Sequence, residues 1–263
     1  MTSLQVIYNS LASEGFSQQV LDLINNYTND ILYGTANFSR FNLPEHAGFC
    51  TAGAALIGAS IVADYARRSL EASCNASGSQ GGGPSNWKID EAQEKAIESW
   101  AKASLLWVED SDVILLRNYG PMIAQGAEAK VYYRSGDTSV VKERASIYST
   151  TQKALDAIVL HNYLFPETAM NVIGFTRDSD SLFRIILTQP YVKCRRLATK
   201  QEIDEMVAAK GFWDNWNGQG VNFTSDRIAL EDMHPANVFI DEITGEPICI
   251  DCIVKFVKMN TLL

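Results

Sequence analysis

The chain has 263 residues, of which 46% are hydrophobic and 20% are charged, with a formal net charge of -9 and a pI near 4.9. These values are typical of a folded globular protein with room for one large domain or two modest ones. Because surfaces that bind nucleic acids are normally basic, the acidic balance argues against direct binding of DNA or RNA.

The sequence favours a cytoplasmic protein over an exported or membrane-bound one. Met1–Gln5 has neither the basic nor the apolar segment of a signal peptide. The longest apolar stretch, Thr51–Ala63, is shorter than the roughly 20 residues that span a bilayer. Its small residues, including Gly58 and Ala59, instead predict a helix that packs closely against a neighbour. The odd number of cysteines, five, fits reduced thiols in a cytoplasm.

Residues 1–110 are predicted to form a helical region with a flexible Gly/Ser-rich loop at 73–86. Apolar residues recur at helical spacing within residues 1–72. The loop consists of small polar residues without an apolar anchor. A further helix is expected over Asp90–Leu106, with Ile97, Ala101 and Leu105 on one face.

From Val113 onward the pattern changes to short strands, interrupted by helices near Ser149–Leu164 and over Lys200–Lys210. After the first of these helices, strands are expected again at Val172–Phe175 and Phe183–Gln189. Near the end of the chain, a hairpin is predicted from two apolar runs and the turn between them: Val238–Asp241, Glu242–Gly245 and Pro247–Ile250.

The segment from Asp232 to Asn237 has the pattern D-x-x-x-x-N, and Asp251 follows at the end of the second hairpin strand. A carboxylate can accept the proton of an attacking hydroxyl, and amide and carboxylate oxygens are hard ligands that suit Mg²⁺. The predicted hairpin would bring Asp251 beside Asn237. The pattern therefore indicates phosphoryl transfer, although D-x-x-x-x-N alone also arises by chance.

A second motif lies upstream and in the matching order. Ala124–Val131 reads as G-x-G-x-x-G-x-V with alanine at the first and third glycine positions, and apolar residues flank it on both sides. Ser139–Lys142 follows as a short strand that ends in lysine. Small residues let backbone N–H groups approach phosphates, and lysine supplies a positive charge to them.

Together these motifs resemble those of the protein-kinase-like superfamily. Their amino-acid sequences are most similar to the kinase domain found in polyvalent proteins of phages and conjugative elements. The resemblance covers Val113–Lys258. It implies an α+β fold with a small antiparallel-sheet N-lobe and a truncated C-lobe, preceded by the helical region. The expected boundaries are 1–110 for the helices and 111–263 for the kinase-like domain, whose N-lobe ends at about 190 and whose short C-lobe covers about 191–263.

The resemblance also assigns roles to individual residues. Asp232 would be the base, and Lys142 would contact the phosphates of ATP. The remaining residues would bind the nucleotide or the metal: Gly126, Ala127, Val131, Lys142, Gln189 and Tyr191 for ATP, and Asn237 and Asp251 for Mg²⁺. The partners implied are a nucleotide and an acceptor that carries a hydroxyl group, either a protein or a small molecule, with no membrane.

Several departures from the family pattern keep a second interpretation open. Leu230 and Glu231 stand where His-Arg precedes the catalytic aspartate, and Cys252 follows Asp251 where phenylalanine is usual. The helix after Lys142 has no glutamate to pair with it, and Asp156 is the best-spaced substitute. The alternative to a kinase is a pseudokinase or interaction scaffold of a mobile genetic element, without catalysis.

Overall fold

The computed structural model describes residues 47–76, 83–126, 128–215, 222–225 and 228–256. The helices expected within residues 1–46, residues 77–82 of the predicted Gly/Ser loop, and Ala127 lie outside these ranges. The chain divides into two compact units. The first includes the chain up to Ser135, Val140–Asp156 and Asn171–Thr188, and the second includes Gly136–Ser139, Ala157–Met170 and the chain from Gln189. Among the described residues, no helix is long and apolar enough to cross a membrane.

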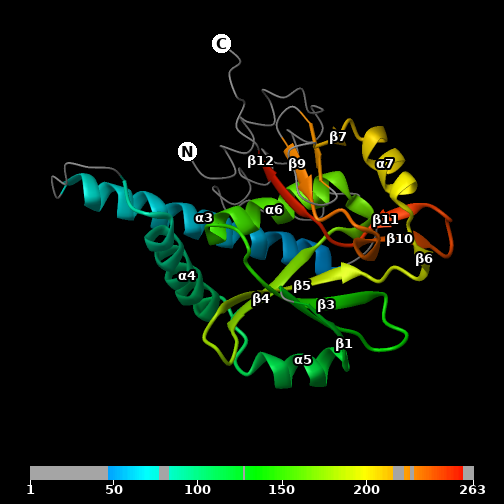
Figure 1. The fold of residues 1–263 in the computed structure, drawn as a ribbon. Helices are drawn as coiled ribbons and strands as arrows, with labels where there is room; N and C mark the ends of the chain where they lie inside the picture. The colour runs from blue at the N-terminus through cyan, green and yellow to red at the C-terminus, as the bar shows by residue number, and fades with distance from the viewer. Residues whose placement is uncertain (1–46, 77–82, 127, 216–221, 226–227, 257–263) are drawn as a thin grey trace, which may run out of the picture. The chain divides into compact units, whose positions relative to one another are not determined.

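Two helices of the first unit, α3 (Ala47–Ala76) and α4 (Asn86–Ala103), lie against each other (Figure 1). Their close approach depends on Gly58, because a Cβ atom there would lie 2.4 Å from the ring of Trp100. Ala59 and Ala63, which follow Gly58 in α3, are fully buried. The prediction of a closely packed helix at Thr51–Ala63 is therefore confirmed.

Two sequence expectations about these helices are wrong in detail. Helix α3 continues to Ala76, past the expected start of the loop at residue 73, since Ser73 satisfies its hydroxyl by donating to the carbonyl of Ser69 inside the helix. Helix α4 ends at Ala103, before Leu105, which has a left-handed φ of 58° and is 93% exposed. The buried face of α4 is Gln93, Ile97 and Ala101 instead.

Residues 111–119 form a helix, α5 (Ser111–Tyr119), although strands were expected from Val113. Helix α5 lies beside strand β2, and Val113 and Leu116 are exposed on it. The β-branched and apolar composition suggested a strand, but two contacts fix the segment as a helix. Ser111 donates to the buried carboxylate of Glu143, and Asp112 accepts from Lys130. Tertiary contacts thus override a weak local preference.

The sheet of the first unit has the strand order β1-β2-β3-β5-β4. The pairs β1–β2, β2–β3 and β4–β5 are antiparallel, as expected for the small sheet. The sequence predicted most of these strands, and their observed bounds are β1 Met122–Gln125, β2 Ala129–Tyr132, β3 Ser139–Ala145, β4 Asn171–Arg177 and β5 Phe183–Pro190. Helix α6 (Thr151–Leu164) follows β3, close to its predicted range.

Helix α4 and the chain that leaves it pack onto this sheet. Phe175 of β4 exchanges backbone hydrogen bonds with Leu106 and Val108, and its ring packs against Trp100 of α4 at a centroid distance of 6.2 Å. Gly174 permits the approach, because a Cβ atom there would lie 2.9 Å from the carbonyl oxygen of Leu106. These contacts join residues on both sides of the expected boundary at 110 within one compact unit.

The second unit contains two further antiparallel sheets, with strand orders β11-β10-β6 and β12-β9-β8-β7. Their strands are short, and helix α7 (Lys200–Ala209) begins with a capping box between Thr199 and Glu202. The strand bounds are β6 Cys194–Leu197, β7 Trp213–Asp214, β8 Phe223–Thr224, β9 Ile228–Glu231, β10 Val238–Asp241, β11 Pro247–Cys249 and β12 Ile253–Phe256. The predicted hairpin is therefore confirmed as β10 and β11.

Substituting Gly58 tests the packing of α3 on α4. Gly58→Ala adds a methyl group against the Trp100 ring, so we expect a loss of about 1–3 kcal/mol in the free energy of unfolding, despite the better helix propensity of alanine. Denaturant unfolding measures the change. Gly83→Ala is the control, because a Cβ atom there meets nothing within 4 Å. Trp100→Phe should relieve the Gly58→Ala loss, and an unchanged loss would contradict this contact.

Candidate active site

The D-x-x-x-x-N segment forms a tight loop between strand β9 and the single turn of 3₁₀ helix η3 (Pro235–Asn237). Asp232 has a left-handed φ of 63°, a conformation that aspartate adopts more easily than most residues. Its backbone N–H donates to the Asn222 side chain at 3.2 Å, and its carbonyl accepts from the N–H of His234 at 2.9 Å. The loop therefore places the Asp232 side chain at the end of a buried strand, half-exposed.

The carboxylate of Asp232 is held from two directions. Its Oδ2 atom accepts from Nδ2 of Asn237 at 3.0 Å, and its Oδ1 atom lies 3.3 Å from Nε2 of His234. The backbone N–H of Ala236 donates to Nδ1 of His234 at 3.2 Å. This bond assigns the proton of a neutral imidazole to Nε2, which faces the carboxylate. His234 therefore helps to hold the loop, since Nε2 also lies 3.3 Å from Nδ2 of Asn237.

Asn237 connects the loop to the hairpin that precedes Asp251. Its Nδ2 atom also donates to the backbone carbonyl of Asp232 at 2.9 Å. The backbone N–H of Ile250 donates to the carbonyl of Asn237 at 2.9 Å. Because Asp251 is the next residue, the backbone of the predicted metal ligand lies beside that of Asn237. Oδ1 of Asp251 accepts from the N–H of Cys252 at 3.0 Å, which orients the carboxylate.

The donors present here fit a hard divalent cation. Within the described ranges, the Asn237 side chain makes its polar contacts through Nδ2. The amide oxygen of Asn237 and the half-buried carboxylate of Asp251 are oxygen ligands of the kind that such a cation binds. Among the described residues no cluster of three or more histidine, cysteine, aspartate or glutamate side chains is suited to a metal. Mg²⁺ does not need one, since it commonly takes one or two protein ligands and completes its shell with phosphates and water.

In the first unit, the residues of the predicted phosphate loop lie at the turn between β1 and β2. The N–H of Gly126 donates to the carbonyl of Ala129 at 2.9 Å, and the position of Gly126 has open space around it. Val131 of β2 is paired with Lys142 of β3 in the antiparallel register. The sheet therefore brings Gly126, Val131 and Lys142 into one hairpin system, while Ala127 lies outside the described residues.

Lys142 and Glu143 are both buried, although they are adjacent on strand β3. Because side chains alternate along a strand, they lie on opposite faces of the sheet. Glu143 accepts from Ser111 of α5 at 2.9 Å, and its other oxygen lies 3.6 Å from Lys130 of β2. Glu143 therefore belongs to the α5 face of the sheet, and Lys142 to the opposite face.

Asp156, the expected partner of Lys142, lies in α6 and accepts from the side-chain nitrogen of Gln152 at 2.8 Å. Desolvation by burial raises the pKa of Asp156 to about 7, the Gln152 hydrogen bond opposes this rise, and the charge of Asp64 adds to it. The carboxyl group is thus poised to gain or lose a proton near neutral pH. Its pairing with Lys142 stays a prediction.

The segment expected to contact adenine makes contacts of its own. The Gln189 side chain is buried and donates to the carbonyl of Thr168 at 2.9 Å. The backbone N–H of Tyr191 donates to the carbonyl of Thr138 at 2.9 Å. A nucleotide would therefore have to contact this segment through backbone groups other than the Tyr191 N–H. Sequence reasoning gave no signal for this bond, because its partners are 53 residues apart.

The site residues thus fall into two groups, each assembled within its own unit. The second unit brings together Asp232, Asn237 and Asp251, and the first brings together Gly126, Val131 and Lys142. Sequence reasoning missed the contact between the His234 ring and the Asp232 carboxylate. Its signal was available in the loop itself, since His234 is two residues from both Asp232 and Ala236.

The family of the chain follows from a comparison with family models. A search of curated proteins found no match. A family model described as a serine/threonine/tyrosine kinase found in polyvalent proteins matches residues 90–258, more than half of the chain. The match contains both groups of site residues and also most of helix α4, from residue 90 onward. The chain therefore belongs to the family of kinases found in polyvalent proteins.

Proposed function

We propose that the chain is an ATP- and Mg²⁺-dependent phosphotransferase that moves the γ-phosphate to a hydroxyl group of an acceptor, with Asp232 as the base. One observation carries the proposal. The loop that holds the Asp232 carboxylate with Asn237 and His234 is bonded, through the Asn237 carbonyl, to the residue before Asp251. The residues proposed as base and as oxygen ligands for a cation thus belong to one hydrogen-bonded piece of backbone.

Asp232 would orient the acceptor hydroxyl and accept its proton as the phosphate is transferred. Its carboxylate is half-exposed, so an acceptor can reach it, and both oxygens are directed by neighbouring donors. Such positioning limits the orientations that the base can adopt, which is how a phosphotransferase lowers its barrier. The acceptor would be a protein or a small molecule.

Asn237 and Asp251 would hold Mg²⁺ through the amide oxygen and the carboxylate. When bound, Mg²⁺ neutralises charge on the phosphates of ATP. Lys142 would bind these phosphates by its positive charge, under the β1–β2 turn with Gly126, Ala127 and Val131. Gln189 and Tyr191 would border the adenine, through backbone groups other than the Tyr191 N–H.

A pseudokinase is the second candidate, and two observations favour it. Alanine stands at the first and third glycine positions of the phosphate loop, residues 124 and 129. The Tyr191 N–H is already used within the protein. A scaffold of this kind would bind nucleotide weakly or not at all, so nucleotide binding and turnover separate the two candidates.

Asp251→Asn tests the metal site. Removing the charge should abolish the increase in ATP affinity that Mg²⁺ gives to the wild type, because an amide is a weaker ligand for a hard cation. Calorimetry with and without Mg²⁺ measures this. Glu242→Gln is the control, since it removes one negative charge from the exposed turn of the neighbouring hairpin, where it pairs with Lys193. Mg²⁺-enhanced binding that survives in Asp251→Asn would refute the assignment.

Asp232→Asn separates binding from chemistry. We expect ATP affinity near that of the wild type, but a fall of about 10²–10⁴-fold in phosphate transfer to the protein itself or to water, because the amide cannot accept the proton. Transfer is measured with labelled ATP. A wild type that binds ATP and Mg²⁺ without any turnover would favour the pseudokinase. Turnover unchanged in Asp232→Asn would show that another group is the base.

The pKa of Asp156 predicts a pH dependence of stability. Its folded pKa of about 7 lies above the unfolded value of about 3.9. Between these values the folded protein keeps a proton that the unfolded chain has released, so this contribution to stability is complete below about pH 4 and is lost as the pH rises through 7. In Asp156→Asn this site binds no proton on folding, so the melting temperature should change less between pH 5 and 8 than in the wild type.

The control for Asp156→Asn is Asp137→Asn, at an exposed turn between β2 and β3, which should leave the wild-type pH profile in place. An identical decline in wild type and Asp156→Asn would mean that another group binds the proton.

A further inference from the structure

Helix α6 begins with a cap supplied from a distant part of the chain. The first N–H groups of a helix have no partners within it. Oδ1 of Asp90, in α4, accepts from the backbone N of Thr151 at 2.5 Å and from its hydroxyl at 2.7 Å. The carboxylate also stabilises the positive end of the helix dipole. Asp90 and Thr151 are 61 residues apart, so the contact is purely tertiary.

A second side chain of α4 satisfies the next N–H group of α6. Oε1 of Gln93 accepts from the backbone N of Gln152 at 3.1 Å. Its Nε2 atom donates to the carbonyl of Ala63, in α3, at 3.2 Å. Gln93 is fully buried. One buried amide therefore joins α3, α4 and the start of α6, and its loss would leave buried polar groups without partners.

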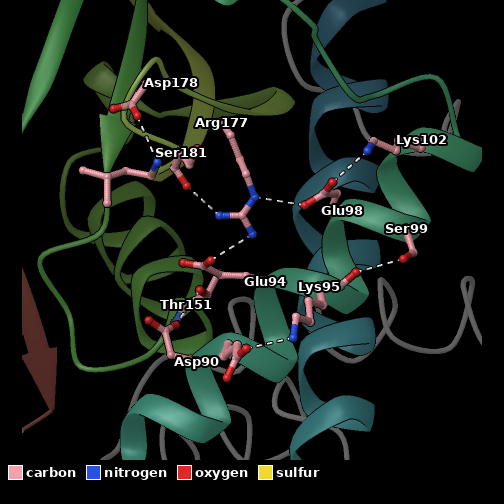
Figure 2. A network of polar contacts seen from close by, with 12 residues as sticks. Asp90, Glu94, Lys95, Glu98, Ser99, Lys102, Thr151, Arg177, Asp178 and Ser181 are labelled. Atoms are coloured by element: carbon pink, nitrogen blue, oxygen red, sulfur yellow. Dashed lines mark hydrogen bonds and ion pairs between the residues drawn. The ribbon is translucent and has the colours of Figure 1, made fainter.

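Helix α4 is itself fixed to the sheet by Arg177, at the end of β4 (Figure 2). The guanidinium group lies 3.1 Å from Glu94 and 3.0 Å from Glu98, and it also donates to the carbonyl of Ser181 at 2.9 Å. Glu94 and Glu98 are one turn apart on α4, so a single arginine holds one face of the helix. Because Arg177 fixes α4 to the sheet, the residues of α4 that cap α6 also hold α6 in place relative to this sheet.

We infer that α4 is a positioning element for the nucleotide site, with Asp90 and Gln93 as positioning residues that fix the first turns of α6 relative to the sheet carrying Lys142. The inference rests on the proposed function, in which Lys142 binds phosphates, and on the predicted pairing of Asp156 of α6 with Lys142. Gln152, whose backbone N–H is held by Gln93, donates from its side chain to Asp156. The chain of contacts therefore runs from α4 to the residue expected beside the lysine.

The test compares two substitutions of Asp90 with a neighbouring control. Asp90→Ala removes the acceptor, while Asp90→Asn keeps an oxygen that can accept from Thr151. Glu91→Ala deletes a carboxylate at the next position of α4, where it is 53% exposed and pairs with Lys95. Two quantities are measured on the full chain: hydrogen exchange of the amides of residues 151–156, and ATP affinity by calorimetry with Mg²⁺.

Asp90→Ala should speed exchange in the first turn of α6 and weaken ATP binding about ten-fold, which corresponds to about 1.4 kcal/mol. Asp90→Asn should recover most of the affinity, and Glu91→Ala should match the wild type in both measurements. If Asp90→Ala does not fold, Thr151→Val deletes only the hydroxyl contact and should weaken ATP binding by a smaller factor, about two- to five-fold. Unchanged affinity in Thr151→Val with faster exchange would count against the inference.

A double-mutant cycle shows whether α4 acts through Lys142. In a Lys142→Ala background, Asp90→Ala should weaken ATP binding no further, because the group being positioned is gone. Additive losses of ATP affinity in the double variant would overturn the inference. Faster hydrogen exchange in Asp90→Ala with full ATP affinity would also overturn it. Either result would leave the proposed function standing. A wild type that binds no ATP would overturn the proposed function, and the positioning role would fall with it.

Discussion

The loop from Asp232 to Asn237 depends on the side-chain amide of Asn237. Its nitrogen donates to both the carbonyl and the carboxylate of Asp232, which stabilises a backbone turn that requires a left-handed aspartate. The Asn237 carbonyl, in turn, accepts from Ile250 and so sets the position of the residue before Asp251. One asparagine thereby links the Asp232 carboxylate, its own amide and the backbone before Asp251 in a single hydrogen-bonded framework.

In the first unit too, buried polar groups are held by specific partners. Strand β3 carries two buried charged residues, Lys142 and Glu143, on opposite faces of the sheet. On one face, Ser111 and Lys130 compensate Glu143, which accounts for the helix α5 in a segment of strand-like composition. Buried charges are tolerated only with such partners, so α5 is part of what makes this sheet stable.

The helices before the sheet also belong to this framework. Helix α4 packs by Trp100 on Phe175, is bonded through Arg177 to the end of β4, and caps α6. The family match begins at residue 90, within α4, rather than at the first strand. Both its packing contacts and the family match therefore group α4 with the kinase-like part of the chain. Helix α3 is joined to α4 by the close contact at Gly58.

The sequence by itself determined the order of the motifs, most strands, helices α6 and α7, and the β10–β11 hairpin, because apolar periodicity and turn residues act over short stretches of chain. It also indicated the kinase family. Only the tertiary structure decided that 111–119 is a helix, that the Tyr191 N–H is occupied, and that Asp90 caps Thr151. Each of these depends on a hydrogen bond between distant residues, and local sequence carries no record of such partners.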